Sequence, residues 1–111
     1  MSDVNQLISI IIPVYNESES IVFLLDEVIN VMSLNKFNFE LIVVNDGSKD
    51  NTHQVLKQLT LKIKELSVSS LRKNYGQTAA MAAGFDFSKG DIVITLDGDL
   101  QNDPNLSLIH I

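Results

Sequence analysis

The stretch LIVVNDGSKDNT, residues 41–52, contains the transition that decides the fold. It opens with an aliphatic run that no polar side chain interrupts, a pattern typical of a strand buried on both faces. Asparagine, aspartate, glycine and serine then favour a turn, and Ser48 or Asp50 is suited to cap a helix that begins shortly afterwards. The stretch therefore predicts a strand, a tight loop and a helix in direct succession.

Similar units repeat along the 111 residues. β-rich runs occur at residues 7–12, 39–44, 66–71 and 92–96, and most of them consist mainly of valine, isoleucine and leucine. Between them, helical spacing predicts three helices, carried by Ile21, Leu24, Leu25, Val28 and Met32, by Val55, Leu56, Leu59 and Ile63, and by the alanine-rich residues 76–89. We expect Asn16 with Glu19 to cap the first helix and Gly90 to end the third. The order βαβαβαβ predicts an α/β fold, a Rossmann-like half with a mainly parallel sheet and helices on both faces.

Composition restricts the classes of function. Hydrophobic residues make up 45% and charged residues 20%, which is typical of a globular domain. A net charge of −6 argues against nucleic-acid binding, so an anionic ligand would need a local helper such as a metal ion. The lack of cysteine excludes thiolate chemistry and is compatible with a cytoplasmic location. No apolar stretch approaches the roughly 18 residues of a membrane span, and the glycine motifs of dinucleotide enzymes, P-loop ATPases and serine hydrolases are missing.

The polar candidate residues all follow predicted strands. Ligands of open α/β sheets bind beyond the carboxyl ends of the strands, where the strand order reverses. The segments after the four runs are residues 13–17, 45–48, 72–76 and 97–103. We therefore expect the chemistry of this chain to lie along one edge of the sheet.

Asp97 and Asp99 follow the fourth predicted strand, with Gly98 between them. Alternate residues can direct both carboxylates to the same side, and Mg²⁺ or Mn²⁺ takes such oxygen ligands together with substrate phosphate. Gln101 adds a neutral oxygen. A β-hairpin turn would need a second strand here, which the polar residues that follow do not supply. An EF-hand loop would need glycine and glutamate where this sequence has asparagine and leucine.

Other residues at this edge are open to two interpretations. Asp46 either accepts hydrogen bonds from a nucleoside base or ribose, or belongs to a turn and helix cap. Arg72, the only arginine, and Lys73 either hold a diphosphate or form a solvated surface pair. Tyr15 and Glu17 either contact a ligand or belong to a packed loop, and their place after the first strand favours the ligand.

Four segments, in this order and spacing, resemble one known family: IIPVYNES, LIVVNDGSKDNT, RKNYGQTAAMAAGF and GDIVITLDGDLQNDP. They are similar to the family 2 glycosyltransferases of GT-A fold. Within that family they look most like the polyprenyl-phosphate glycosyltransferases, the group of dolichol-phosphate mannose synthase and the bacterial undecaprenyl-phosphate sugar transferases. The resemblance covers about residues 8–104.

The resemblance implies a role for each candidate residue. Asp97, Asp99 and Gln101 would hold Mg²⁺ or Mn²⁺ on the diphosphate of a nucleotide sugar. The nucleotide would be bound by Pro13, Tyr15 and Glu17 lining the nucleoside pocket, by Asp46 on the base, by Arg72 near the nucleotide, and by Asp97.

The implied reaction is the inverting transfer of a sugar from a UDP- or GDP-linked donor to a polyprenyl phosphate. The metal would stabilise the leaving nucleoside diphosphate, and an ionised phosphate acceptor needs little help from a general base. The DLQ and NYGQ elements favour this lipid acceptor; a polysaccharide or another acceptor is the alternative. Full-length relatives of this kind work at the cytoplasmic face of the membrane.

Family members continue with acceptor-binding segments and often with membrane helices. We expect residues 1–105 to be the N-terminal, nucleotide-sugar-binding part of a truncated GT-A domain with little activity alone. Membrane association and any catalytic base would then belong to the missing part. Residues 106–111, LSLIHI, coincide with a translation of a transposase sequencing adapter and are expected to be a non-native tail in which His110 has no function; the alternative is the apolar start of a further element.

Two other classes share some of these features. A sugar-nucleotide nucleotidyltransferase has the same architecture, but PVYNES lacks the glycine-rich basic loop expected after the first strand. A non-catalytic, receiver-like module that binds Mg²⁺ would carry acids after the first strand, whereas the acid pair here follows the fourth.

Overall fold

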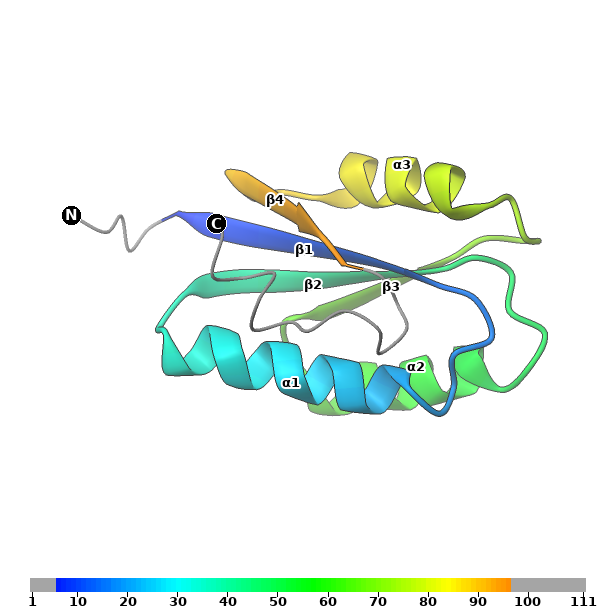
Figure 1. Cartoon of the computed structure of the whole chain (residues 1–111), viewed down its shortest axis with the longest axis horizontal. Helices are drawn as coiled ribbons and strands as arrows, with labels where there is room; N and C mark the ends of the chain where they lie inside the picture. The colour runs from blue at the N-terminus through cyan, green and yellow to red at the C-terminus, as the bar shows by residue number, and fades with distance from the viewer. Residues whose placement is uncertain (1–5, 97–111) are drawn as a thin grey trace.

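The computed structural model describes residues 6–96 as a parallel sheet with helices on both faces (Figure 1). The elements are β1 (Leu7–Val14), α1 (Ile21–Leu34), β2 (Asn38–Asn45), α2 (Thr52–Lys62), β3 (Leu66–Ser70), α3 (Gln77–Phe87) and β4 (Ile92–Thr95). This order confirms the predicted βαβαβαβ arrangement. The predicted tail, residues 106–111, lies outside the described residues. Within residues 6–96, no helix is long and apolar enough to cross a membrane.

The strands lie in the order β3-β2-β1-β4 and all pair in parallel. In the register of β1 with β2, Leu7 is opposite Asn38 and Val14 is opposite Asn45. The chain moves outward from β1 through β2 to β3 and then crosses back to place β4 on the other side of β1. The strand order therefore reverses between β1 and β4, the place where ligands of such sheets bind.

The larger core lies between the sheet and the layer of α1 and α2, which cover the same face (Figure 1). Its buried side chains are nearly all aliphatic: Ile8, Ile10, Ile12, Val14, Ile21, Leu24, Leu25, Val28, Val31, Met32, Leu41, Val43, Leu56, Leu66 and Leu96. All five apolar residues that predicted the first helix are buried here, which confirms that periodicity. In the second helix Leu56 is buried, whereas Val55 and Leu59 are partly buried.

The core on the α3 side of the sheet is small. It contains the buried residues Ile11, Ile42, Val44 and Ala80, with Leu71 and Ala83 packed against them. Gly84 of α3 lies directly against β1, because a Cβ on Gly84 would be 2.4 Å from Cγ2 of Ile11. Small residues on this face of α3 therefore allow the helix to approach the sheet closely.

The predicted role of Gly90 as a helix cap is wrong. α3 ends at Phe87 with Ser88 at its C-cap. Gly90 instead lies against the buried Ser9: its N–H donates to Ser9 Oγ at 2.8 Å, and a Cβ would be 2.4 Å from that oxygen. Ser9 Oγ donates in turn to Glu40 Oε2 at 2.5 Å, so the serine buried in β1 is satisfied.

The predicted capping of α1 by Asn16 and Glu19 is also wrong, because α1 begins at Ile21 without a side-chain capping bond. At the start of α2, one of the two predicted capping residues, Ser48 and Asp50, makes a capping bond. Asp50 Oδ1 accepts the N–H of Thr52, the first residue of α2, at 2.9 Å. Of the two candidates for that cap, it is therefore Asp50 that bonds to the first turn.

Candidate functional site

Three loops lie at the carboxyl edge of the sheet: residues 15–20 after β1, 46–51 after β2 and 71–76 after β3. The first loop is hydrogen-bonded to the second, and the second is hydrogen-bonded to the third. Backbone and side-chain bonds between neighbouring loops restrict their motion, so this edge is organised before any ligand binds.

The chain returns to this edge after β4. Leu96 is buried, and its N–H donates to the carbonyl oxygen of Ile11 at 3.0 Å, so the chain still runs beside β1 at the last described residue. Asp97, Asp99 and Gln101 follow in sequence and lie outside the described residues. Their predicted metal-binding role stays a prediction, as does the nucleotide contact of Asp97.

Asn16 joins the first two loops. Its side-chain Oδ1 accepts the N–H groups of Lys49 at 2.8 Å and Asp50 at 3.3 Å, and its own N–H donates to Ser48 Oγ at 2.9 Å. The φ angle of Asn16 is 53°, a left-handed conformation in which asparagine is enriched among non-glycine residues. This conformation lets one residue bond to the second loop through both its backbone and its side chain.

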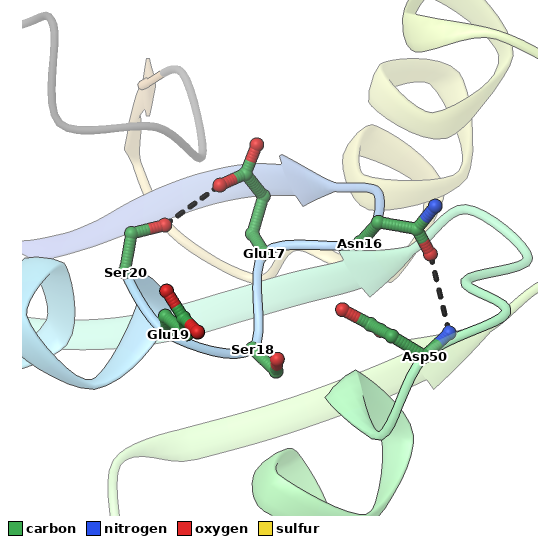
Figure 2. A pocket seen from close by; sticks show the side chains of 6 residues that line it. All are labelled: Asn16, Glu17, Ser18, Glu19, Ser20 and Asp50. Atoms are coloured by element: carbon green, nitrogen blue, oxygen red, sulfur yellow. Dashed lines mark hydrogen bonds between the residues drawn. The ribbon is translucent and has the colours of Figure 1, made fainter.

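A pocket of about 340 Å³ lies where the first two loops meet (Figure 2). It is lined by Asn16, Glu17, Ser18, Glu19, Ser20 and Asp50. Glu17 is oriented by Ser20, whose hydroxyl donates to Glu17 Oε2 at 2.7 Å. Within residues 6–96, no group of three acidic or histidine side chains is arranged to hold a metal ion. An anionic lining of this kind favours hydrogen-bond donors of a ligand, such as hydroxyl groups, over a bare phosphate.

The carboxylate of Asp46 is buried beneath the third loop, and the residue is 3% exposed. Asp46 Oδ1 accepts the N–H of Tyr75 at 2.8 Å, and Oδ2 accepts the N–H of Gly76 at 2.9 Å. The amide of Asn74 donates to Asp46 Oδ2 at 3.0 Å and to the Asp46 carbonyl oxygen at 3.1 Å. The predicted contact of Asp46 with a base stays a prediction. Among the described residues, the carboxylate is hydrogen-bonded to residues 74–76.

Gly47 brings the second and third loops into backbone contact. Its φ angle is 70°, and a Cβ there would lie 2.2 Å from the carbonyl carbon of Lys73 and 2.4 Å from the nitrogen of Asn74. Both the left-handed conformation and the close approach require glycine. The glycine in the NDGS turn, residues 45–48, therefore lets the turn lie directly against the segment that carries Arg72.

Arg72 and Tyr15 lie outside the lining of the pocket. Arg72 is exposed and makes no hydrogen bond or ion pair with another described residue. Lys73 Nζ lies 5.3 Å from the ring centroid of Tyr75, within the range of a cation–π contact. Tyr15 is 38% exposed. Of the predicted nucleotide-binding residues, the pocket contains Glu17.

Pro13 is buried in β1, opposite Val44 of β2. The carbonyl oxygen of Val14 accepts a bond from Asp46, on the β2 side, whereas that of Ile11 accepts one from Leu96, on the β4 side. Backbone groups of a strand alternate in direction, so the nitrogen of Pro13 faces the β4 side, beyond the last paired residue of β4. The missing N–H therefore removes no bond between β1 and β2.

Asp50, one of the residues that line the pocket, has a lowered pKa. The hydroxyl of Thr52 donates to its carboxylate and, as the largest cause, lowers the pKa of Asp50 below that of an ordinary aspartate. Partial desolvation opposes this effect, and bonds from the Thr52 N–H and from Ser18 add to it. Asp50 therefore stays ionised at the mouth of the pocket.

Sequence reasoning missed the roles of Asn16 and Asn74. Asn16 carried a usable signal, because asparagine after a strand often marks a left-handed turn position. Asn74 carried none, since its partner Asp46 is 28 positions away in the sequence.

The fold is that of the GT-A glycosyltransferases. A mannosyltransferase from Pyrobaculum calidifontis, solved with GDP-Man and Mn²⁺, superposes with a TM-score of 0.73 at 24% identity, over 83% of this chain and 27% of that one. Glucosyl-3-phosphoglycerate synthase from Mycobacterium tuberculosis, solved with Mn²⁺, UDP and glucosyl-3-phosphoglycerate, gives 0.69 at 25% identity, over 90% of this chain and 36% of that one. Both neighbours thus hold a divalent metal together with a nucleotide.

The sequence model of glycosyl transferase family 2 matches residues 9–109. This chain therefore belongs to glycosyltransferase family 2, which confirms the resemblance. An undecaprenyl-phosphate 4-deoxy-4-formamido-L-arabinose transferase from Pseudomonas fluorescens (strain SBW25) is 46% identical over 98 residues. The match covers 87% of this chain and 29% of that relative, so the chain spans less than a third of the relative's length.

Proposed function

We propose that this chain is the donor-binding part of an inverting glycosyltransferase that moves a sugar from a UDP- or GDP-linked donor to a polyprenyl phosphate. The observation that carries this proposal is the strand order. The order reverses between β1 and β4, and Leu96, the last described residue, lies at that edge; Asp97-Gly98-Asp99 follows it in the sequence. The printed name of the 46% identical relative supports the lipid-phosphate acceptor.

The nucleotide-binding set comprises Pro13, Tyr15, Glu17, Asp46, Arg72 and Asp97. Glu17, held by Ser20, offers its carboxylate to hydroxyl groups of the donor. Arg72 has no partner among the described residues and is available to an anionic group. Arg72 is not among the residues that line the pocket, and we assign its guanidinium to the phosphates of the donor.

The metal would be Mg²⁺ or Mn²⁺, held by Asp97, Asp99 and Gln101. Two carboxylates and an amide oxygen form the hard oxygen donor set that these ions prefer. When bound, such an ion offsets the charge that develops on the departing nucleoside diphosphate. The two GT-A neighbours that contain Mn²⁺ with a nucleotide support this assignment.

The acceptor phosphate would attack the anomeric carbon of the donor sugar. A bond forms between that carbon and a phosphate oxygen while the bond to the nucleoside diphosphate breaks, with inversion at the carbon. Because the phosphate is ionised near neutral pH, no proton has to be removed from the nucleophile. Because the acceptor is a lipid, we expect the whole protein to catalyse this reaction at a membrane, and the family resemblance implies its cytoplasmic face.

Titration calorimetry with UDP, GDP and CDP, each with and without Mn²⁺, tests the donor site. We expect at least one nucleotide to bind in the presence of Mn²⁺ and to bind at least tenfold more weakly in Asp97→Ala and Asp99→Ala. Asp86→Ala is the matched control, because Asp86 is an exposed carboxylate on α3.

Two results would contradict the proposal. One is Mn²⁺-dependent nucleotide binding that survives both substitutions. The other is a response to acetyl phosphate with Mg²⁺ in the absence of any nucleotide binding, which would indicate a receiver-like module instead.

A further inference from the structure

Thr52, the first residue of α2, is fully buried, and its hydroxyl connects two loops at the carboxyl edge. The hydroxyl oxygen accepts the N–H of Glu17, in the loop after β1, at 3.1 Å. The same hydroxyl donates to Asp50 Oδ1, in the loop after β2. Because an ionised carboxylate can only accept, the hydroxyl proton is directed to Asp50, and a lone pair remains for Glu17. Asp50 therefore orients the hydroxyl that holds the backbone of Glu17.

Thr52 is itself held in place by the second helix. Its N–H donates to Asp50 Oδ1 at 2.9 Å. Leu56, one turn further along the same face of α2, is buried in the larger core. The position of the Thr52 hydroxyl relative to the sheet is thus fixed by the packing of α2.

Glu17 is bonded through its backbone and its side chain. Its carbonyl oxygen accepts the N–H of Ile21 at 2.9 Å, and its Oε2 accepts the hydroxyl of Ser20 at 2.7 Å. These two bonds are local, whereas the bond to Thr52, 35 positions away, joins Glu17 to another part of the fold. The Glu17 side chain lines the pocket (Figure 2), so a shift of its backbone would displace the carboxylate there.

We propose that Thr52 is a positioning residue for the donor site: its hydroxyl, oriented by Asp50, holds the Glu17 backbone and so places the Glu17 carboxylate for the hydroxyl groups of the donor. This role rests on the proposed function, in which Glu17 binds the nucleotide. Thr52 is buried and is not among the residues that line the pocket, so it acts through Glu17. Loss of its hydroxyl should then weaken binding only while the Glu17 carboxylate is present.

Hydrogen exchange of the 111-residue chain, measured by NMR, tests the structural half. Thr52→Val keeps the shape of the side chain but removes the hydroxyl, so the Glu17 N–H loses its acceptor. We expect exchange at the Glu17 amide to accelerate about fivefold, the effect of losing one neutral hydrogen bond, and Thr52→Ser to restore the rate. The amide of Asn16, which donates to Ser48 Oγ at 2.9 Å, should keep its rate, since a general loosening of the loop would accelerate both.

Thr60→Val is the matched control variant. Thr60 is in the same helix, and its hydroxyl donates to the carbonyl oxygen of Lys57 within that helix at 2.6 Å. The substitution removes a hydroxyl of the same kind without affecting the bond to the first loop. Exchange at Glu17 and nucleotide binding should therefore both stay as in the parent.

Calorimetry with UDP, GDP and CDP in the presence of Mn²⁺ tests the functional half. For each nucleotide that the parent binds, Thr52→Val should weaken binding about fivefold and Thr52→Ser less than about twofold. In a Glu17→Ala background, Thr52→Val should have no further effect, because the carboxylate that it displaces is absent. A role in stability alone would weaken binding by the same factor in both backgrounds.

Asp50→Ala is the second variant, used if Thr52→Val fails to fold. It keeps the Thr52 hydroxyl but removes the carboxylate that orients it. It should also accelerate exchange at Glu17 and weaken binding, again only while the Glu17 carboxylate is present. A direct contact of Asp50 with the nucleotide would instead persist in the Glu17→Ala background.

The proposal is overturned by unchanged exchange at Glu17 in Thr52→Val, or in Asp50→Ala if the first variant does not fold. It is equally overturned if that variant has the same effect on binding with and without the Glu17 carboxylate. If the parent binds no nucleotide, or if Glu17→Ala binds it as well as the parent, the proposed function of Glu17 fails. The exchange data alone then still decide whether Thr52 holds the Glu17 backbone.

Discussion

Two residues at the carboxyl edge have left-handed backbone conformations, which most residue types disfavour. Asn16 and Gly47 have φ angles of 53° and 70°, and both lie where two loops touch. Such conformations persist when the surroundings stabilise them, and they are common near ligand sites. The pocket and its neighbouring segment are therefore built from positions where a substitution should disturb both stability and binding.

Gly47→Ala should destabilise the chain by about 3 kcal/mol, because it combines backbone strain with a collision against the backbone of Lys73. Gly76→Ala is the comparison, since Gly76 also has a positive φ but a Cβ there meets no atom within 4 Å. Urea unfolding should show the larger loss for Gly47→Ala. Equal losses would mean that the contact with Lys73 contributes nothing.

Asn16→Gly should lower the free energy of unfolding by about 1–2 kcal/mol, because it keeps the left-handed backbone but removes the acceptor for Lys49 and Asp50. Asn16→Ala should cost about 1 kcal/mol more, since alanine also resists a φ of 53°. Denaturant unfolding of both variants measures the two effects separately. An Asn16→Gly variant as stable as the parent would show that the side-chain bonds do not stabilise the loops.

Thr52→Val should raise the pKa of Asp50 toward its ordinary value, because it removes the hydroxyl that donates to the carboxylate. Thr52→Ser keeps a hydroxyl and should keep the pKa low. NMR titration of the Asp50 side-chain carboxyl carbon measures both. An unchanged pKa in Thr52→Val would contradict the assigned cause.

The same pKa shift has a defined effect on stability. A carboxylate whose pKa is lower in the folded state than in the unfolded state stabilises the fold above about pH 4 and loses that effect as the pH falls through the folded value. Thr52→Val should therefore lose less stability than the parent when the pH falls from about 5 to 3, with a small amplitude because Asp50 is exposed.

At the scale of elements, α3 differs from the other helices. α1 buries large aliphatic side chains, whereas α3 faces the sheet with Ala80, Ala83 and Gly84. Its N-terminal end is held by Asp46, and its close approach to β1 depends on the absence of a side chain at Gly84.

Gly84→Ala should destabilise the chain by up to about 2 kcal/mol. Alanine improves helix propensity by about 1 kcal/mol, but the new methyl group would lie 2.4 Å from Ile11 Cγ2, and overpacking of this kind costs about 1–3 kcal/mol. In an Ile11→Ala background the colliding atom is absent, so Gly84→Ala should there become neutral or stabilising. Urea unfolding of the four proteins in this double-mutant cycle measures the coupling, and additive effects would contradict the contact.

At the scale of the whole molecule, the protein and its proposed ligand are both negatively charged. A chain of net charge −6 is proposed to bind a diphosphate, and the described pocket adds Glu17, Glu19 and Asp50 to the local negative charge. A divalent cation at the Asp97–Gln101 segment would reverse the local field. The sign of the salt dependence of binding therefore reports whether a cation is present.

Removal of divalent ions with EDTA should weaken nucleoside diphosphate binding at least tenfold. The residual, metal-free affinity should stay level or rise between about 20 and 200 mM NaCl, because salt screens the repulsion between two anions. With Mn²⁺ present, the affinity should fall over the same range. Calorimetric titrations at several salt concentrations give both slopes, and a metal-free affinity that falls with salt would point to a basic phosphate site instead.

Much of the fold could be predicted from residue patterns. Strands such as β1, with its buried run Ile8 to Val14, are recognisable because a strand covered on both faces is mostly apolar, and the exception Ser9 is hydrogen-bonded. The spacing of Ile21, Leu24, Leu25 and Val28 identifies a helix because one face of it must be buried. Because strands and helices alternate along the chain, the sequence predicts a parallel sheet. The family motifs then indicate that the ligand site lies at the carboxyl edge of this sheet.

The contacts between loops were decided by the tertiary structure. Asp46 meets residues 74–76, Asn16 meets Lys49 and Asp50, and Gly90 meets Ser9, in each case across 28 or more positions of sequence. Periodicity reports which side chains are buried within an element, but it carries no information on which loops become neighbours. That depends on the strand order β3-β2-β1-β4 and its register, which bring the ends of β1, β2 and β3 together. Asn16, predicted to cap a helix, therefore joins two loops instead, because its partners are set by which strand ends are neighbours.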